Sequence, residues 1–263
     1  MVEVEGTKDF TGTGEAYDRF MGRYSHLLAP QFADFCGVRE GQRLLDVGCG
    51  PGAFTGVAAQ LLGPSAVVAV DPAPSFVAAC RQRYPDVDVR AGAAEDLPVD
   101  DASFDRAVAQ LVIHFVTDPA RSVAEMTRVV RPGGVVGVCV WHSTDAMGLL
   151  HVVGQARAAV EPPDAEPEDR PFGHEGELAA LLSGAGLVDV TDAPLTVTVG
   201  YSGFEELWSS LREGIGPAGA YVVSLGPEAR ETYRAALFDL VGRPEGGFTL
   251  DATALAARGV VPE

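Results

Sequence analysis

The sequence predicts an α/β fold in which a doubly wound, mostly parallel sheet carries helices on both faces. Between residues 43 and 142, short runs rich in Val, Leu and Ala alternate with longer runs of helical periodicity. Turns that contain Gly and Pro separate these runs. Such alternation is typical of a parallel sheet, because strands buried on both faces read as continuous apolar runs.

The elements of this core can be placed in order along the chain. Apolar residues at helical spacing over 14–36 predict an N-terminal helical arm ahead of the core. The expected strands are 43–47, 66–71, 87–92, 106–110 and 135–141. The expected helices are 53–62, 74–84 and 119–130, and the Pro-Gly-Gly turn at 132–134 closes the last of them before its strand.

The pattern is looser after residue 146. An acidic, Pro-rich segment at 161–171 predicts a linker or mobile loop. The expected elements beyond it are a helix at 175–185, a long strand at 187–201, helices within 204–240 and a final strand at 247–259 that returns to the sheet edge. We therefore divide the chain into an arm or lid (1–36), an α/β core (37–145) and the remainder of the sheet with helical cap insertions (146–263).

Composition and charge restrict the classes of partner. The chain has 263 residues, 47% of them hydrophobic, and its formal net charge of -18 repels phosphate backbones. Four scattered cysteines favour buried thiols over a disulfide scaffold, and no His, Asp or Glu cluster has metal-ligand spacing. The N-terminus lacks a signal-peptide pattern, and no apolar run is long enough to cross a bilayer. We expect a cytoplasmic protein without nucleic-acid, membrane or metal partners, either monomeric or homodimeric.

A glycine-rich turn follows the first expected strand in LLDVGCGPGAFT, residues 44–55. Gly48, Gly50 and Gly52 remove Cβ atoms where the backbone must approach a ligand. Asp71 ends the next strand, about twenty residues further on, and suits hydrogen bonds to both ribose hydroxyls. This spacing indicates a nucleoside, but Gly48, Gly50 and Ala53 also satisfy the loose dinucleotide pattern. A nicotinamide or flavin enzyme and a purely structural turn are the competing interpretations.

Residues at the ends of the first, third and fourth expected strands favour a ligand with an amino-acid group. Asp46 lies before the glycines, where a carboxylate suits an ammonium better than a pyrophosphate. The turn at 93–96 suits an adenine edge, and Gln110 and Leu111 lead from the fourth strand toward the reacting centre. Together these features favour a nucleoside joined to a cationic amino acid.

Four segments, LLDVGCGPG, VVAVDPAPSFV, AAEDLPVDDASFD and EMTRVVRPGGVV, resemble in order and spacing the class I S-adenosylmethionine-dependent methyltransferases, of the small-molecule type that includes quinone-biosynthesis-like enzymes. The resemblance covers about residues 40 to 142 and implies a Rossmann-like sheet of seven strands with S-adenosylmethionine as cofactor. The segment YDRFMGRYS resembles the family's arm over the methionine end of the cofactor.

Carried over residue by residue, the resemblance implies a set of cofactor contacts. The glycine turn backs the methionine and ribose, Asp71 holds the ribose, Ala94 and Glu95 meet the adenine, and Gln110 and Leu111 lie near the methionine. Ala93 stands where many relatives have an acidic residue. The full expected set is Tyr17, Arg23, Tyr24, Asp46, Gly48, Cys49, Gly50, Gly52, Asp71, Pro72, Ala94, Glu95, Gln110 and Leu111.

Methyl transfer from a sulfonium is an in-line displacement that needs orientation, exclusion of water and, for some acceptors, a base. His114 follows the fourth strand and His142 the fifth, so both are candidate catalytic bases, with His114 nearer the expected methyl group. Each also fits a core or second-sphere histidine. Candidate acceptor contacts are Phe20, Met21, Phe115, Trp141, Phe172, Trp208 and Tyr221, although aromatic residues at helical spacing commonly fill a core.

The sequence thus predicts a methyltransferase acting on a small, partly apolar metabolite, natural-product-like or quinone-like. An NAD(P)-dependent oxidoreductase remains an alternative, as does a protein that binds S-adenosylmethionine without methyl transfer, such as a cyclase or a regulatory module. The acceptor atom, whether O, N or C, is left open.

Overall fold

A computed structural model describes residues 18–143, 148–161 and 171–263 of the protein. Its seven-stranded sheet has the order β3-β2-β1-β4-β5-β7-β6. The strands are β1 (Leu44–Val47), β2 (Val67–Asp71), β3 (Asp88–Ala91), β4 (Phe104–Gln110), β5 (Val130–Trp141), β6 (Val188–Tyr201) and β7 (Phe248–Val260). The first five strands pair in parallel, and β7 runs antiparallel to both neighbours. The predicted doubly wound, mostly parallel sheet is confirmed.

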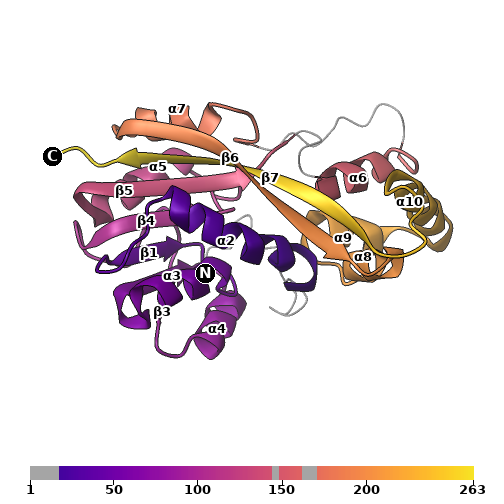
Figure 1. The fold of residues 1–263 in the computed structure, drawn as a ribbon, viewed down its shortest axis with the longest axis horizontal. Coiled ribbons are helices and arrows are strands. Elements are labelled where there is room, and N and C mark those ends of the chain that lie inside the picture. The colour runs from indigo at the N-terminus through magenta and orange to yellow at the C-terminus, as the bar shows by residue number, and fades with distance from the viewer. Residues whose placement is uncertain (1–17, 144–147, 162–170) are drawn as a thin grey trace.

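Helices pack on both faces of this sheet (Figure 1). A π-helical turn η1 (Asp18–Gly22) leads into α2 (Arg23–Phe35). The other helical elements are α3 (Ala53–Leu62), η2 (Pro64–Ala66), α4 (Pro74–Arg83), α5 (Pro119–Val129), α6 (Gly148–Arg157), α7 (Glu177–Gly184), α8 (Phe204–Leu211), α9 (Gly216–Ser224) and α10 (Pro227–Leu240). The predicted ranges of the core helices agree with these bounds to within about one residue. The predicted arm, 14–36, includes η1 and α2 and begins before the described residues.

Two apolar cores, one on each face, explain why the strands are continuously apolar. Along β2, Val67 and Ala69 belong to the core beneath α2, α3 and α4, whereas Val68 and Val70 belong to the core beneath α5 and α7. Successive side chains of a strand point to opposite faces, so a strand covered on both sides needs apolar residues at every position.

Two details of the sheet correct the sequence analysis. The final strand, β7, does not lie at the edge: it inserts between β5 and β6. Its second half is alanine-rich and buried on both faces, which suits an interior position, whereas β6 is half exposed and contains Pro194, which an edge strand tolerates. The Pro-Gly-Gly segment lies within β5, where the pairing with β4 jumps from Val130 to Val135.

The hairpin of β6 and β7 joins the sheet to a helical cap. Only the second half of β7, from Ala254 onward, pairs with β5, so the first half extends past the sheet with β6 as a two-stranded ribbon. In Figure 1 this ribbon leads to α6, α8, α9 and α10, gathered at its far end. The predicted linker at 161–171 lies almost wholly outside the described residues. Within the described residues, none of the helices has the length and hydropathy that a bilayer crossing requires.

Candidate active site

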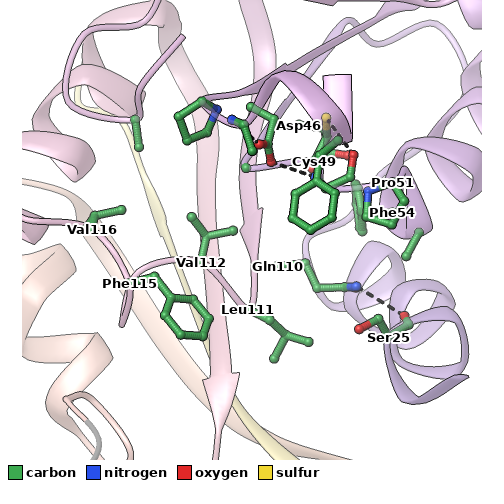
Figure 2. Close-up of a pocket in the computed structure, with 18 of the residues that line it drawn as sticks. Ser25, Asp46, Cys49, Pro51, Phe54, Gln110, Leu111, Val112, Phe115 and Val116 are labelled. Carbon is green, nitrogen blue, oxygen red and sulfur yellow. Dashed lines mark hydrogen bonds between the residues drawn. The ribbon is translucent and has the colours of Figure 1, made fainter. Parts of the chain in front are cut away.

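A pocket lies beside the carboxyl ends of β1, β2 and β4 (Figure 2). Its walls come from the glycine turn, the segment after β2, the loop after β3 and the loop after β4, and Ser25 of α2 contributes as well. In a doubly wound sheet, ligands bind in the crevice at the carboxyl ends of the strands. The fold therefore places ten of the fourteen expected cofactor residues around one cavity, whereas Arg23, Tyr24 and Gly52 do not line it.

Backbone hydrogen bonds to β2 hold the glycine turn in place. The Gly48 amide donates to the Val70 carbonyl at 2.7 Å, and its φ of 70° is in the left-handed region. A Cβ at this position would lie 2.5 Å from a methyl carbon of Val112, so a larger residue would clash. A Cβ at Gly50 would meet no atom within 4 Å, which leaves that side of the turn open to a ligand.

Asp71 ends β2 and turns its carboxylate toward this turn. One oxygen accepts a hydrogen bond from the Gly50 amide and the other from the Ala73 amide, each at 2.8 Å. The side chain is buried, and burial raises its pKa to about 6, although the two amides oppose this shift. A carboxylate oxygen has two lone pairs, so each oxygen retains one for a ligand hydroxyl.

Asp46 lies on the neighbouring strand β1 and is also buried. Its carboxylate accepts a hydrogen bond from the Thr55 hydroxyl at 2.6 Å. Burial raises its pKa to about 7; the Thr55 hydrogen bond lowers it and the charge of Asp71 raises it further. A cationic group in the pocket would stabilise the ionised form of both carboxylates, because an opposite charge favours that form.

The loop after β3 supplies another wall. Ala93, Ala94 and Glu95 line the pocket, whereas Asp96 is not among its lining residues. The Glu95 carboxylate accepts hydrogen bonds from the backbone amides of Thr117 and Asp118, at 2.9 and 3.4 Å. Glu95 therefore ties this loop to the start of α5 as well as facing the pocket.

The end of β4 forms the floor between the sheet and α2. The Gln110 amide nitrogen donates to the Ser25 carbonyl at 3.1 Å, as Figure 2 shows. The Gln110 side-chain oxygen is buried and has no hydrogen-bond partner within the described residues. Leu111 follows with a positive φ of 63°, held by a hydrogen bond from its amide to the Cys139 carbonyl. Such strain in a non-glycine residue is commonly retained at functional sites.

The predicted arm residues are engaged with the cap side of the sheet. Arg23 pairs with Glu206 at 2.8 Å and stacks over the Tyr201 ring. The Tyr24 hydroxyl shares a hydrogen bond of 2.9 Å with the Tyr201 hydroxyl. Neither Arg23 nor Tyr24 lines the pocket, and Tyr17 lies outside the described residues. Their contact with the methionine end of the cofactor stays a prediction.

Neither candidate base, His114 or His142, lines the pocket. The His114 ring packs on Phe115, with 3.9 Å between ring centroids, and Phe115 itself lines the pocket and is 40% exposed. His142 follows Trp141 at the end of β5, where its amide donates to the Thr253 carbonyl. A base role for either histidine stays a prediction.

The other predicted acceptor contacts lie in apolar cores. Trp141 meets the Tyr24 ring edge-on, and Phe20 and Met21 pack in the same cluster. Trp208 and Tyr221 both pack against Tyr233 within the cap. Phe172 packs against the opposite core. None of these six lines the described pocket, so their contact with an acceptor stays a prediction.

Several residues that line the pocket were not predicted from the sequence. Most of them are immediate neighbours of motif residues, so adjacency would have found them: Pro51, Ala53, Phe54, Ala73, Val112 and Val116. Phe76 reaches the pocket from the first turn of α4, and Ser25 from α2. Gly52 was expected to face the ligand, but it caps α3, and a Cβ there would lie 2.6 Å from the Tyr84 ring.

Comparisons with known proteins agree with this geometry. A family model described as a methyltransferase domain matches residues 45–138. An uncharacterised methyltransferase of Mycobacterium tuberculosis is 37% identical over 142 residues, 53% of this chain and 55% of that protein. A ubiquinone biosynthesis O-methyltransferase of Xanthomonas axonopodis pv. citri is 32% identical over 170 residues, 62% of this chain and 70% of that protein.

The fold also matches solved structures. The crystal structure of the YcgJ protein from Bacillus subtilis aligns with a TM-score of 0.57 and 18% sequence identity, over 92% of this chain and 99% of that one. The chain spans 34% to 55% of the length of four of its curated relatives. With the sheet order, the glycine turn and these matches in agreement, the chain belongs to the class I S-adenosylmethionine-dependent methyltransferases.

Proposed function

We propose that this protein transfers the methyl group of S-adenosylmethionine to a small, partly apolar metabolite, either natural-product-like or quinone-like. The observation that carries the proposal is the pair of buried carboxylates, Asp46 and Asp71, in one pocket beside the glycine turn. Burial raises the pKa of both, so the pocket suits a ligand that brings positive charge and hydroxyl donors. The pyrophosphate of a dinucleotide would add negative charge there, which disfavours the oxidoreductase alternative.

The contacts suggest how the cofactor lies. Asp71 has one lone pair free on each oxygen for the two ribose hydroxyls. The adenine faces the loop of Ala94 and Glu95, and the methionine end lies toward Asp46 and Gln110. The unpartnered oxygen of Gln110 suits an N–H donor such as the ammonium, because a buried acceptor without a donor is unfavourable.

The bound sulfonium supplies an already activated methyl group, so the residues of this chain need only bind, orient and exclude water. Ser25 and Leu111 close the pocket at the end of β4, and Val112 and Phe115 give it an apolar wall. An acceptor with a flat, apolar scaffold would pack against that wall. The relative named for ubiquinone biosynthesis makes a hydroxylated quinone precursor the first acceptor to test.

A hydroxyl acceptor loses a proton as it is methylated, and we assign this proton to His114. The assignment is supported by its neighbour Phe115, which packs against the imidazole and lines the pocket. With cofactor saturating at every pH, the methylation rates of His114→Ala and His114→Gln should fall and their pH dependence should differ from that of the wild-type protein. An unchanged profile would remove His114 from this role and leave His142 as the candidate.

Calorimetric titration tests the cofactor assignment directly. S-adenosylhomocysteine should bind the wild-type protein and the Asp192→Ala variant, which alters an exposed carboxylate on β6, with similar affinity. NADH should not bind. Tight NADH binding with no S-adenosylhomocysteine binding would overturn the assignment.

Methyl transfer itself needs a second experiment. The protein is incubated with cofactor labelled on the methyl group and with a panel of hydroxylated quinones and phenols, followed by a cell extract. We expect a labelled product of low molecular mass. Binding of the cofactor with no labelled product in any mixture would favour a protein that uses it without transfer.

A further inference from the structure

Helix α2 contacts both the cofactor pocket and the hairpin of β6 and β7. On the pocket side, the Ser25 carbonyl accepts a hydrogen bond from the Gln110 amide nitrogen at 3.1 Å (Figure 2). On the hairpin side, Arg23 and Tyr24, the two residues before Ser25, bind groups at the end of β6 and in the first turn of α8. Three consecutive residues of the helix thus connect the pocket with the base of the cap.

The contacts to the hairpin are polar and partly buried. The hydroxyls of Tyr24 and Tyr201, both buried residues, share a hydrogen bond of 2.9 Å. Arg23 donates to one oxygen of Glu206 at 2.8 Å, and its guanidinium lies 4.3 Å from the centroid of the Tyr201 ring. The other Glu206 oxygen accepts hydrogen bonds from the Ser202 amide and hydroxyl, at 2.6 and 2.8 Å, which fix the direction of the carboxylate.

The first turns of α2 receive little support from the helix itself. The N-cap residue is Gly22, which has no side chain to accept a hydrogen bond from the first turn. Pro30 lies within the helix and cannot donate the backbone hydrogen bond that a helix interior normally makes. The position of Ser25 therefore depends on contacts outside the helix, which include those of Arg23 and Tyr24 with the hairpin.

The position of Ser25 in turn determines how the Gln110 amide is oriented. The Ser25 carbonyl engages the amide nitrogen, and the amide oxygen is buried without a hydrogen-bond partner within the described residues. That oxygen is the acceptor to which we assign the ammonium of the cofactor. A displaced α2 would free the amide to rotate, and the nitrogen, which is only a donor, could not accept a hydrogen bond from an ammonium.

We propose that Tyr201 and Glu206 are positioning residues for the amino-acid end of the cofactor. Through Tyr24 and Arg23 they hold α2 in place, so that Gln110 presents its oxygen to the ammonium. The inference rests on the proposed function, because it takes S-adenosylmethionine as the ligand of the pocket. It adds a connection through which the base of the cap controls cofactor affinity.

Two ligands that differ at the amino-acid end test this role. S-adenosylhomocysteine and methylthioadenosine share the nucleoside and the thioether sulfur, but methylthioadenosine lacks the amino acid. In calorimetry, Tyr201→Phe and Glu206→Ala should each bind S-adenosylhomocysteine about tenfold more weakly than the wild-type protein. Their affinity for methylthioadenosine should stay within about twofold of the wild-type value. An equal loss for both ligands, as general destabilisation would cause, or no loss for S-adenosylhomocysteine, would overturn the proposal.

The residue next to Glu206 supplies a matched control. Glu205 lies on the same helix, but it pairs with Arg234 of α10 and not with α2. Glu205→Ala should therefore bind both ligands as the wild-type protein does. A loss of S-adenosylhomocysteine affinity in Glu205→Ala as large as that in Glu206→Ala would show that the contact with α2 is not the cause, and would overturn the proposal.

A double-variant cycle tests the route through Gln110. Gln110→Leu removes the acceptor oxygen, so adding Glu206→Ala to it should cause no further loss of S-adenosylhomocysteine affinity. A loss as large as in the wild-type background would overturn the proposal. Failure of the proposed function gives a different result, because the wild-type protein itself would then not bind S-adenosylhomocysteine.

Discussion

The buried carboxylates make cofactor affinity depend on pH in a direction that can be worked out. Binding should tighten as the pH rises through about 6 to 7, because Asp46 and Asp71 have pKa values of about 7 and about 6 in the empty pocket. Both must ionise to meet an ammonium and two hydroxyl donors. Each pH unit below a pKa weakens such binding by about 1.4 kcal/mol.

The expected magnitude follows from these values. At about pH 5, Asp46 lies about two pH units below its pKa, which corresponds to about 2.7 kcal/mol, or about 100-fold weaker binding than above pH 7. Asp71 adds up to about tenfold, because about pH 5 lies about one pH unit below its pKa.

Stability of the empty protein should change in the opposite direction. Both pKa values lie above the 3.8 of the unfolded chain, so the neutral carboxyl is favoured in the fold. These two groups therefore stabilise the empty protein as the pH falls from about 7 toward 4. Weak binding at low pH would therefore not result from unfolding caused by protonation of Asp46 and Asp71.

Calorimetry measures both quantities. S-adenosylhomocysteine is titrated at several pH values, and near the midpoint in two buffers of different ionisation enthalpy, which gives the number of protons released. The Asp46→Asn variant should bind more weakly at high pH and lose most of the pH dependence. A wild-type affinity that is constant from about pH 5 to about pH 8, or an unchanged profile in Asp46→Asn, would refute the reasoning.

Three further predictions concern single contacts. Asp71→Ala removes the acceptor for two backbone amides and for the ribose, so S-adenosylhomocysteine affinity should fall by about 2–3 kcal/mol in calorimetry; an unchanged affinity would place the ligand elsewhere. Gly48→Ala adds a clash to a positive φ and should lower the melting temperature more than Gly63→Ala does. At Gly63 the φ is also positive, 84°, but the space is open, so only backbone strain of about 1 kcal/mol is expected. Equal losses of melting temperature in the two variants would contradict the clash. Tyr24→Phe and Tyr201→Phe should each lower the free energy of unfolding in urea by about 1–2 kcal/mol, and the double variant by less than the sum; strict additivity would show that the shared hydrogen bond contributes nothing.

Much of the fold was predictable because local patterns and long-range packing agree in the core. The strand that ends at Asp46 and Val47, the helix at 53–62 and the strand that ends at Asp71 are bounded by glycines and prolines, and both strands are buried at every position. Parallel strands bring their carboxyl ends to the same edge, so residues such as Asp71 and Gln110, far apart in the chain, were predicted to line one pocket.

The tertiary structure alone decided features that depend on pairing and on competition between partners. Position in the sheet depends on which strand edge is free when the chain returns from the cap, so sequence did not place β7 between β5 and β6. Arg23 and Tyr24 carry groups that could bind a carboxylate, and in the fold they pair with Glu206 and Tyr201, 183 and 177 residues away. Such contacts depend on distances that no local spacing encodes. The sequence determined the core strands and the ligand-facing turn, and three-dimensional packing determined which side chains remain available to a ligand.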